Sequence, residues 1–139
     1  MRELHDHKLT GLNEAINIAV NDHPGPGGAN HDYVIIVPKQ VSESGAKELS
    51  GLRIQFQNGP IKETGINGIS NEALLAIVID RLRGFQYQRT EKDEFKNVPG
   101  PFACRENAIA LTHLEDAMHW LQHRTRARLA RGVEGTNQK

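Results

Sequence analysis

The sequence predicts an α+β chain: a small antiparallel β-sheet at the amino-terminal side, followed by a two-helix antiparallel hairpin, in an oligomer. Up to about Asn58 the apolar residues recur at every second position, which is typical of half-buried strands. Beyond Ser70 they recur at three- and four-residue intervals, which indicates amphipathic helices. We expect residues 1–69 to form a β meander and residues 70–139 the helical hairpin, within one compact structural unit.

Three apolar runs are expected to pair as the meander. They span residues 16–20, 33–37 and 52–56. Arg53, Gln55 and Gln57 alternate with the apolar residues of the third run, so one face of this strand is expected to be exposed. Stretches rich in glycine, proline and serine, at residues 23–28 and 42–45, are typical of the turns between strands.

Two helices are predicted in the second half of the chain. The first begins after Ser70, a favourable N-cap residue, and Gly84 is expected to end it. The second begins near Arg105 and is closed by Gly132, and a polar segment over residues 86–101 connects the two. Their apolar stripes consist of Leu74, Leu75, Val78, Ile79 and Leu82 in the first helix and Leu111, Leu114, Met118 and Leu121 in the second.

The first helix is apolar on more than one side, because Leu74 and Leu75 are adjacent, as are Val78 and Ile79. One partner helix cannot cover such a surface. The sheet, a second subunit, or both must cover the remainder, so the sequence predicts oligomerisation.

The charges of the chain balance: 17 lysine and arginine residues against 17 aspartate and glutamate residues give a formal net charge of zero. No overall field attracts a nucleic-acid polymer, so an anion site must be a local cluster. Cys104 is the single cysteine, which excludes an intrachain disulfide and fits a reducing cytoplasm. The amino-terminal residues contain no apolar run that fits a signal peptide or a membrane span, so we expect no membrane partner.

An arginine cluster lies at the end of the second predicted helix. Arg124, Arg128 and Arg131 stand at i, i+4 and i+7, so they share one helical face. Guanidinium groups bind phosphates bidentately, and a row of them suits a ligand with several phosphates. The same residues are equally expected in a solvated helix end that complements the helix dipole.

Aromatic and polar residues flank the connection between the helices. Phe85 and Phe102 lie at its two ends, where a phenyl ring beside arginines can stack a nucleobase or simply pack in the core. Arg105 and Asn107 open the second helix, where free backbone N–H groups attract anions. Asn107 is interpreted either as a reader of a base edge or as a helix cap.

Other chemical motifs are incomplete. The glycine-rich stretch at residues 24–28 lacks the Gly-Lys-Ser/Thr ending of a phosphate-binding loop. His119 and His123 stand at i, i+4, yet no carboxylate or cysteine completes a metal set. For Cys104, a packed or buried thiol is the favoured interpretation over a nucleophile. We expect no catalytic residue, no metal and no cofactor.

An ordered string of motifs extends along most of the chain. It comprises residues 13–14, 26–29, 56–63, 65–68, 71–82, 85–86, 104–107, 119–121, 124–125 and 131–136. This string resembles the phage Thoeris anti-defence family of the first-described type, whose helical hairpin is related to that of a phage anti-CBASS sponge.

The resemblance implies a protein that binds a signal without turning it over. Members of the family sequester cyclic ADP-ribose isomers made by Thoeris sensors, so that the effector never receives its signal. Some members also bind the cyclic di- and trinucleotides of CBASS at separate pockets of a hexamer, which is assembled as a trimer of dimers. For this chain the resemblance implies self-association as a dimer or hexamer and host immune evasion in the host cell cytoplasm.

The resemblance also implies roles for individual residues. Phe85 would stack a base, Asn107 would read polar groups of the ligand, and Arg124 and Arg128 would clamp its phosphates. Arg105 would belong to the second kind of pocket, which forms only where dimers meet.

One departure from the family concerns the connection over residues 86–101, which is longer than the family's usual short turn. If it repositions Phe85, Phe102 or Tyr87 would be the stacking ring instead. Two other functions are consistent with the residues: an enzyme that hydrolyses the cyclic nucleotide signal, and a nucleic-acid-binding regulator that uses the arginine face. The enzyme would turn over many signal molecules per protein. The regulator would bind duplex DNA with a steep dependence on salt concentration, and the zero net charge of the chain disfavours this function.

Overall fold

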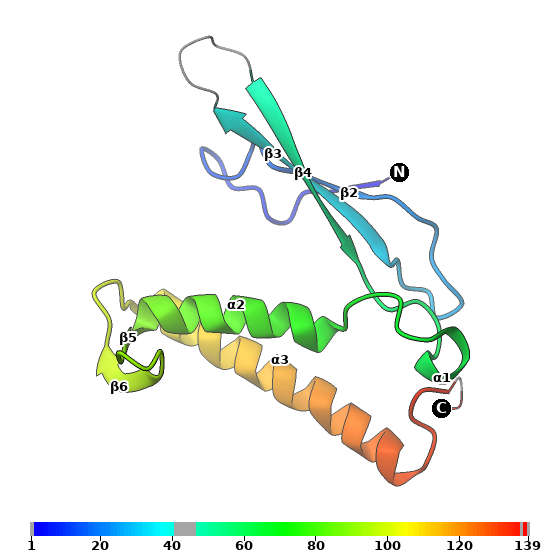
Figure 1. The fold of residues 1–139 in the computed structure, drawn as a ribbon. Helices are drawn as coiled ribbons and strands as arrows, with labels where there is room; N and C mark the ends of the chain where they lie inside the picture. The colour runs from blue at the N-terminus through cyan, green and yellow to red at the C-terminus, as the bar shows by residue number, and fades with distance from the viewer. Residues whose placement is uncertain (1, 41–46, 137, 139) are drawn as a thin grey trace. The chain divides into compact units, whose positions relative to one another are not determined.

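The computed structural model describes residues 2–40, 47–136 and 138. The chain divides into two compact units, residues 1–69 (unit 1) and residues 70–139 (unit 2). Unit 1 contains β1 (Arg2–Leu4), β2 (Asn17–Val20), β3 (Asp32–Gln40), β4 (Lys47–Gln55) and α1 (Ile61–Thr64). Unit 2 contains α2 (Asn71–Gln86), β5 (Tyr87–Arg89), β6 (Phe95–Pro99) and α3 (Arg105–Ala130) (Figure 1). The predicted α+β class, with an antiparallel sheet ahead of the helices, is confirmed.

The four strands of unit 1 form one antiparallel sheet in the order β1-β2-β3-β4. Ile35 of β3 lies opposite Ile18 of β2 and Leu52 of β4, so the three predicted runs pair in sequence order. Val20 is only 2% exposed and forms the centre of a small core. Strand β1 was not predicted, because three residues are too few to show a period. The predicted turn at residues 42–45 lies outside the described residues.

Residues 56–69 close the end of unit 1 as a hydrogen-bonded loop. Asn58 N–H donates to Asn67 Oδ1 at 2.8 Å, and Asn67 Nδ2 donates back to the Asn58 carbonyl at 2.8 Å. Gly68 passes so close to the Phe56 backbone that a Cβ there would lie 2.4 Å from the carbonyl carbon. This position therefore requires glycine.

Helix α2 begins as predicted but ends later. Ser70 Oγ accepts a hydrogen bond from Ala73 N–H at 3.1 Å, which confirms the N-cap. The predicted stop at Gly84 is wrong, since α2 continues to Gln86 and Gly84 has no positive φ. The helix ends instead where Tyr87 enters the strand β5, in extended conformation.

The connection between α2 and α3, predicted as a polar segment, is a two-stranded antiparallel sheet of β5 and β6. Arg89 joins it to α2: its guanidinium pairs with Asp80 at 3.2 Å and with Asp93, and lies 4.4 Å from the centre of the Phe95 ring. The strands β5 and β6, of three and five residues, show almost no alternation of apolar residues, so periodicity in the sequence could not reveal them.

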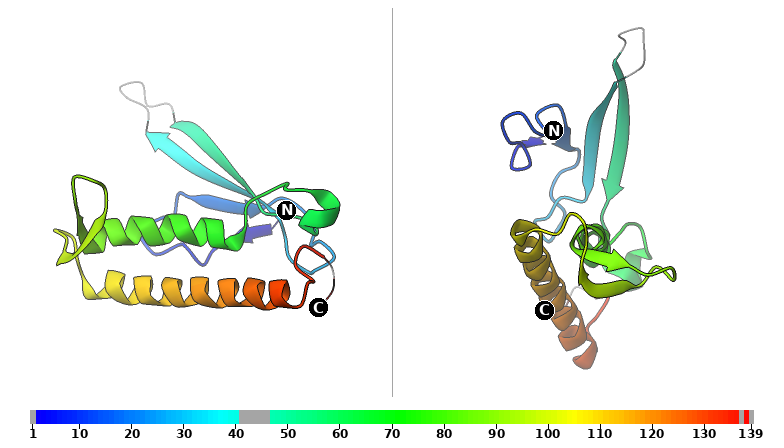
Figure 2. Two further views of the ribbon diagram at one scale, coloured as in Figure 1. Left: turned by 60° about the horizontal axis from the view of Figure 1, so that its bottom comes forward. Right: turned by 90° about the vertical axis from the view of Figure 1, so that its left-hand side faces the viewer.

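Helices α2 and α3 lie side by side in unit 2 (Figures 1 and 2). Their contact buries Ile79 of α2 and Leu111 of α3, which are 5% and 3% exposed. Gln86 Oε1 accepts a hydrogen bond from Cys104 N–H at 3.2 Å, which places the end of α2 beside the start of α3. No helix in the described ranges combines the length and the apolar character needed to cross a membrane.

Asp32 connects three segments of unit 1. Arg53 of β4 donates to both of its oxygens, at 2.8 and 2.7 Å, and Asn21 Nδ2 donates at 2.8 Å. The hydrogen bond from Arg53, then that from Asn21, and the positive charge of Arg53 lower the pKa of Asp32 to about 2. An aspartate whose folded-state pKa is lowered stabilises the fold above its unfolded pKa of about 4.

We expect Asp32→Asn to lower the thermal unfolding midpoint of the protein at pH 7, because the variant lacks the charged partner of Arg53. The difference from wild type should shrink as the pH falls from about 4 toward 2, where the wild-type carboxylate is protonated as well. Circular dichroism melts across this pH range measure the difference. Asp6→Asn removes the same charge from an exposed turn and serves as the control; a difference that persists undiminished at pH 2 would contradict the assignment.

Candidate functional site

The residues that the sequence marks as a ligand site lie at two ends of the α2–α3 pair. Phe85, Arg105 and Asn107 lie where α2 ends and α3 begins, here called the Phe85 end. Arg124 and Arg128 lie near the other end of α3, here called the Arg124 end. Asn107 and Arg124 are separated along α3 by about 26 Å at 1.5 Å per residue. One small ligand therefore cannot contact both ends within a single chain.

At the Phe85 end, the Phe85 ring is half-buried and lies beneath a cation. The Arg81 guanidinium, one turn earlier on α2, lies 5.0 Å from the ring centre. A Cβ at Gly100 would lie 2.9 Å from the Phe85 carbonyl oxygen, so β6 leads back tightly against the end of α2. Phe102 is 72% exposed, which excludes core packing for this ring. The arrangement provides aromatic and guanidinium planes suited to stacking.

The first turn of α3 leaves the Asn107 side chain available. Cys104 is the N-cap, and its sulfur accepts a hydrogen bond from Asn107 N–H at 3.4 Å, so Asn107 is not the cap. The expectation of a packed or buried thiol is wrong, because the N-cap position leaves Cys104 exposed. Within the described ranges, the side chains of Asn107 and Arg105 have no hydrogen-bond partner.

At the Arg124 end, Arg128 binds the carboxyl-terminal segment. Its Nε donates to Glu134 Oε2 at 2.8 Å, and its Nη2 donates to the carbonyls of Val133 and Thr136 at 3.0 and 2.9 Å. Only 14% of the Arg128 side chain is exposed. Its guanidinium is therefore occupied by the protein itself. The sequence pattern did not reveal Glu134 as this partner. The signal available was the pair of glycines, Gly132 and Gly135, whose positive φ angles make the tight return of the chain possible.

Arg124 differs from Arg128, although both were expected on one face. Arg124 is exposed and, among the described residues, has neither a hydrogen bond nor an ion pair. Arg131, also exposed, donates weakly from Nε to the Ala127 carbonyl at 3.4 Å. Of the three arginines on this face, Arg124 is thus the one whose guanidinium has no partner among the described residues.

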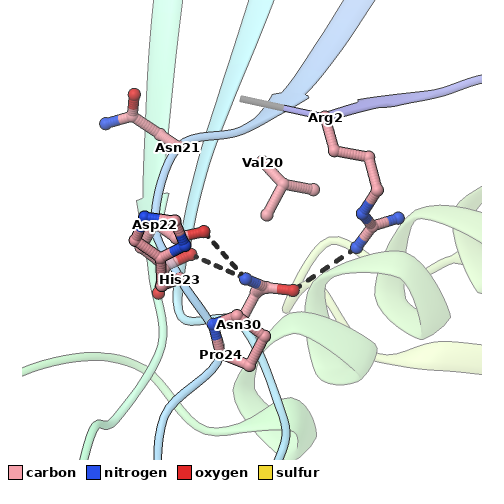
Figure 3. A pocket seen from close by; sticks show the side chains of 7 residues that line it. All are labelled: Arg2, Val20, Asn21, Asp22, His23, Pro24 and Asn30. Atoms are coloured by element: carbon pink, nitrogen blue, oxygen red, sulfur yellow. Dashed lines mark hydrogen bonds between the residues drawn. The ribbon is translucent and has the colours of Figure 1, made fainter.

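Three pockets in the described part of the chain are lined by none of the five predicted site residues. A groove of about 460 Å³ between α2 and α3 is crossed by the ion pair of Arg83 and Glu115, at 2.6 Å. A pocket of about 250 Å³ in unit 1 contains Arg2, which reaches Asn30 Oδ1 at 3.4 Å, while Asn30 Nδ2 donates to the Asp22 carbonyl at 2.9 Å (Figure 3). A third, of about 380 Å³, lies in the same unit beside residues 11–16 and Val37.

The structure shows the surroundings of two motifs that were incomplete in the sequence, the glycine-rich loop and the histidine pair of α3. In the glycine-rich loop, Gly25 N–H donates to the Ala29 carbonyl and Gly28 N–H to the Gly25 carbonyl, both at 2.8 Å, so these amides are used within the loop. The rings of His119 and His123 are 6.4 Å apart. Over the described ranges, no three His, Cys, Asp or Glu side chains converge on a point suited to a metal ion.

Comparison with known proteins identifies relatives of this region. Residues 48–126 match the family model of the Acb2/Tad1 hairpin domain, a range that includes Phe85, Asn107 and Arg124 but not Arg128. The chain is 48% identical over 86 residues to Thoeris anti-defense 1 of Bacillus phage SBSphiJ7. The alignment covers 62% of this chain and 52% of the relative, so the chain spans about half the length of the curated relative that it matches.

We expect Arg128→Ala to release residues 133–136 from α3. The Thr136 amide, which donates to the Val133 carbonyl at 3.2 Å, should exchange with solvent roughly tenfold faster, since hydrogen bonds to a charged group are worth about 1.5 kcal/mol or more. Hydrogen exchange followed by NMR measures this rate. Arg126→Ala, which alters an exposed arginine two residues away, should leave it unchanged; equal rates in all three proteins would show that Arg128 does not hold the segment.

Proposed function

Since the chain belongs to the Acb2/Tad1 hairpin family, we propose that it is a phage anti-defence protein that binds and sequesters cyclic ADP-ribose-type signals of Thoeris without cleaving them. Its relationship to Thoeris anti-defence proteins, first indicated by the ordered motifs, is confirmed by the comparison. We extend the proposal to CBASS cyclic di- and trinucleotides at separate sites that include Arg105, and to action in the host cell cytoplasm.

The observation that carries the proposal is that the family-matching region contains both a stacking group, Phe85, and a free cation, Arg124. The Phe85 ring, with Arg81 over it, suits a purine base. At the same end of the helix pair, the side-chain amide of Asn107 has no hydrogen-bond partner among the described residues. Arg124 has no internal counter-charge among the described residues, so its guanidinium can bind a phosphate at no cost to the fold. A ring-closed molecule with a base and a diphosphate presents both kinds of group.

The two ends have to come from different chains if they bind one molecule, because α3 separates them by about 26 Å. We propose that two copies pack so that the Phe85 end of one meets the Arg124 end of the other. A second apolar stripe on α2 supports this, formed by Leu74, Ile77, Val78 and Phe85 at helical spacing. Ile77 is 65% exposed and points away from α3-facing Ile79, so a second chain can cover it.

The exposed area of the chain also supports an assembly. Its accessible surface is 10623 Å². Two separate compact units of half this mass would together expose about 8,700 Å². Contacts between subunits would bury part of this excess. We propose a dimer as the smallest form with complete sites, and a trimer of dimers as the form that carries the second kind of pocket.

A sequestering protein requires affinity and slow release instead of turnover. We expect cyclic ADP-ribose isomers to bind at a stoichiometry of up to one per chain, and the bound molecule to be recovered chemically unchanged after the protein is denatured. Calorimetry measures binding, and mass spectrometry of the released ligand measures its integrity. A linearised product would identify an enzyme and contradict the proposal.

We expect Phe85→Ala and Arg124→Ala each to weaken binding by about 1–3 kcal/mol, through loss of a base stack and of a charged hydrogen bond. Arg126→Ala is the matched control, because it removes an equally exposed arginine two residues from Arg124. Unaltered affinity in both folded variants would remove the site assignment.

Mixing the two defective variants tests whether the site is shared between copies. In a two-fold dimer of one Phe85→Ala chain and one Arg124→Ala chain, one of the two pockets has both residues intact. Random mixing should therefore restore tight binding to roughly one pocket in four. If each pocket lay within one chain, the mixture would bind no better than the separate variants, and the shared-site arrangement would be wrong.

A further inference from the structure

Trp120 is a large aromatic side chain that the packing of unit 2 does not use. It is the single tryptophan of the sequence and is 66% exposed. It follows the buried Leu111 by nine residues, two and a half helical turns, and so lies on the opposite side of α3 from the contact with α2. An exposed tryptophan on a helix marks a contact site more often than other exposed apolar residues do.

Two histidines hold the Trp120 ring from its sides. The His119 ring meets it at 5.6 Å with an angle of 77° between the ring planes, and the His123 ring at 5.6 Å with an angle of 67°. Such edge-to-face contacts restrict the rotation of the indole while most of its surface stays open to solvent. A ring that is already oriented loses little conformational entropy when a flat ligand stacks on it.

Arg124 lies one helical turn beyond Trp120, on the same side of α3. Its guanidinium has no partner among the described residues, whereas Arg128, the next arginine on this face of α3, is bound to Glu134. The backbone positions that carry this open indole and this free guanidinium are therefore about 6 Å apart along the helix axis. A base attached through its ribose to a phosphate offers a flat ring and an anion at comparable separation.

We propose that Trp120 is a stacking residue of the ligand site: its indole stacks on the purine of a nucleotide whose phosphate is bound by Arg124. The inference rests on the proposed function, because both use Arg124, and it adds a specificity determinant that neither motif spacing nor the comparisons assign. It makes affinity depend on a base at the Arg124 end as well as on phosphate charge. Ligands with a phosphate and no base would bind weakly there.

Trp120 allows a direct test, since it is the single tryptophan of the sequence and selective excitation of tryptophan reports on this residue alone. We expect cyclic ADP-ribose to quench it, and ribose 5-phosphate, which has a phosphate but no base, to leave it unchanged at the same concentration. In calorimetry, Trp120→Ala should weaken cyclic ADP-ribose binding about 5-fold or more, as for a lost base stack, while Trp120→Phe should retain most of the affinity. Leu129→Ala, at a 61% exposed apolar residue of the same helix, should bind like wild type.

The outcomes separate this inference from the function on which it rests. Cyclic ADP-ribose binding that leaves the fluorescence and the Trp120→Ala affinity unchanged would overturn the stacking role and leave the sequestering function intact. No heat of binding and no quenching with wild type would remove both. Native mass spectrometry of Trp120→Ala without ligand gives the remaining outcome: a smaller assembly than wild type would show that the indole is a subunit contact, which also overturns the inference.

Discussion

The helix pair of unit 2 depends on one apolar seam, in which Ile79 of α2 and Leu111 of α3 are almost completely buried. Because each helix uses only one side in this contact, the opposite sides remain available. On α2 that side carries Ile77 and ends at Phe85, and on α3 it carries Trp120 and Arg124. The proposed ligand chemistry lies on or beside these unburied sides. A chain with a thicker core would have buried the residues that a partner or a ligand needs.

The arginines of α3 divide into two kinds by their partners. Arg128 is surrounded by acceptors of the carboxyl-terminal segment, with Glu134 supplying a full counter-charge, and its hydrogen bonds hold residues 133–136 and Gln138. Arg124, one turn earlier, has no such partner among the described residues. A guanidinium that is already paired must give up its hydrogen bonds before it can bind a phosphate, whereas an unpaired one exchanges only water. This difference favours Arg124 as the phosphate ligand and gives Arg128 a structural role in the ligand-free chain.

The two-stranded sheet of β5 and β6 takes the place of the polar segment that was predicted between the helices. It is fixed to the end of α2 by Arg89, which contacts Asp80, Asp93 and the Phe95 ring. The close approach of Gly100 to the Phe85 carbonyl returns the chain to the start of α3. The β5–β6 connection thus leaves Phe85 and Asn107 at the same end of the helix pair, although they are 22 positions apart in the sequence. Phe102, exposed beside them, offers a further ring at this end.

The sequence by itself determined the features that neighbouring residues decide. The period-two runs, the N-cap at Ser70, the start of α3 after Cys104 and the closing glycine at residue 132 follow from contacts within a few residues, and the structure has all of them. The types of side chain suited to a cyclic nucleotide were equally visible, because stacking and phosphate binding need particular chemical groups. Tertiary structure decided which of those groups are free. Arg124 and Arg128 are alike in the helical pattern, and only the return of residues 133–136 pairs Arg128 and leaves Arg124 open. Likewise, the extension of α2 beyond Gly84 and the β5–β6 sheet depend on contacts between segments that no local period records.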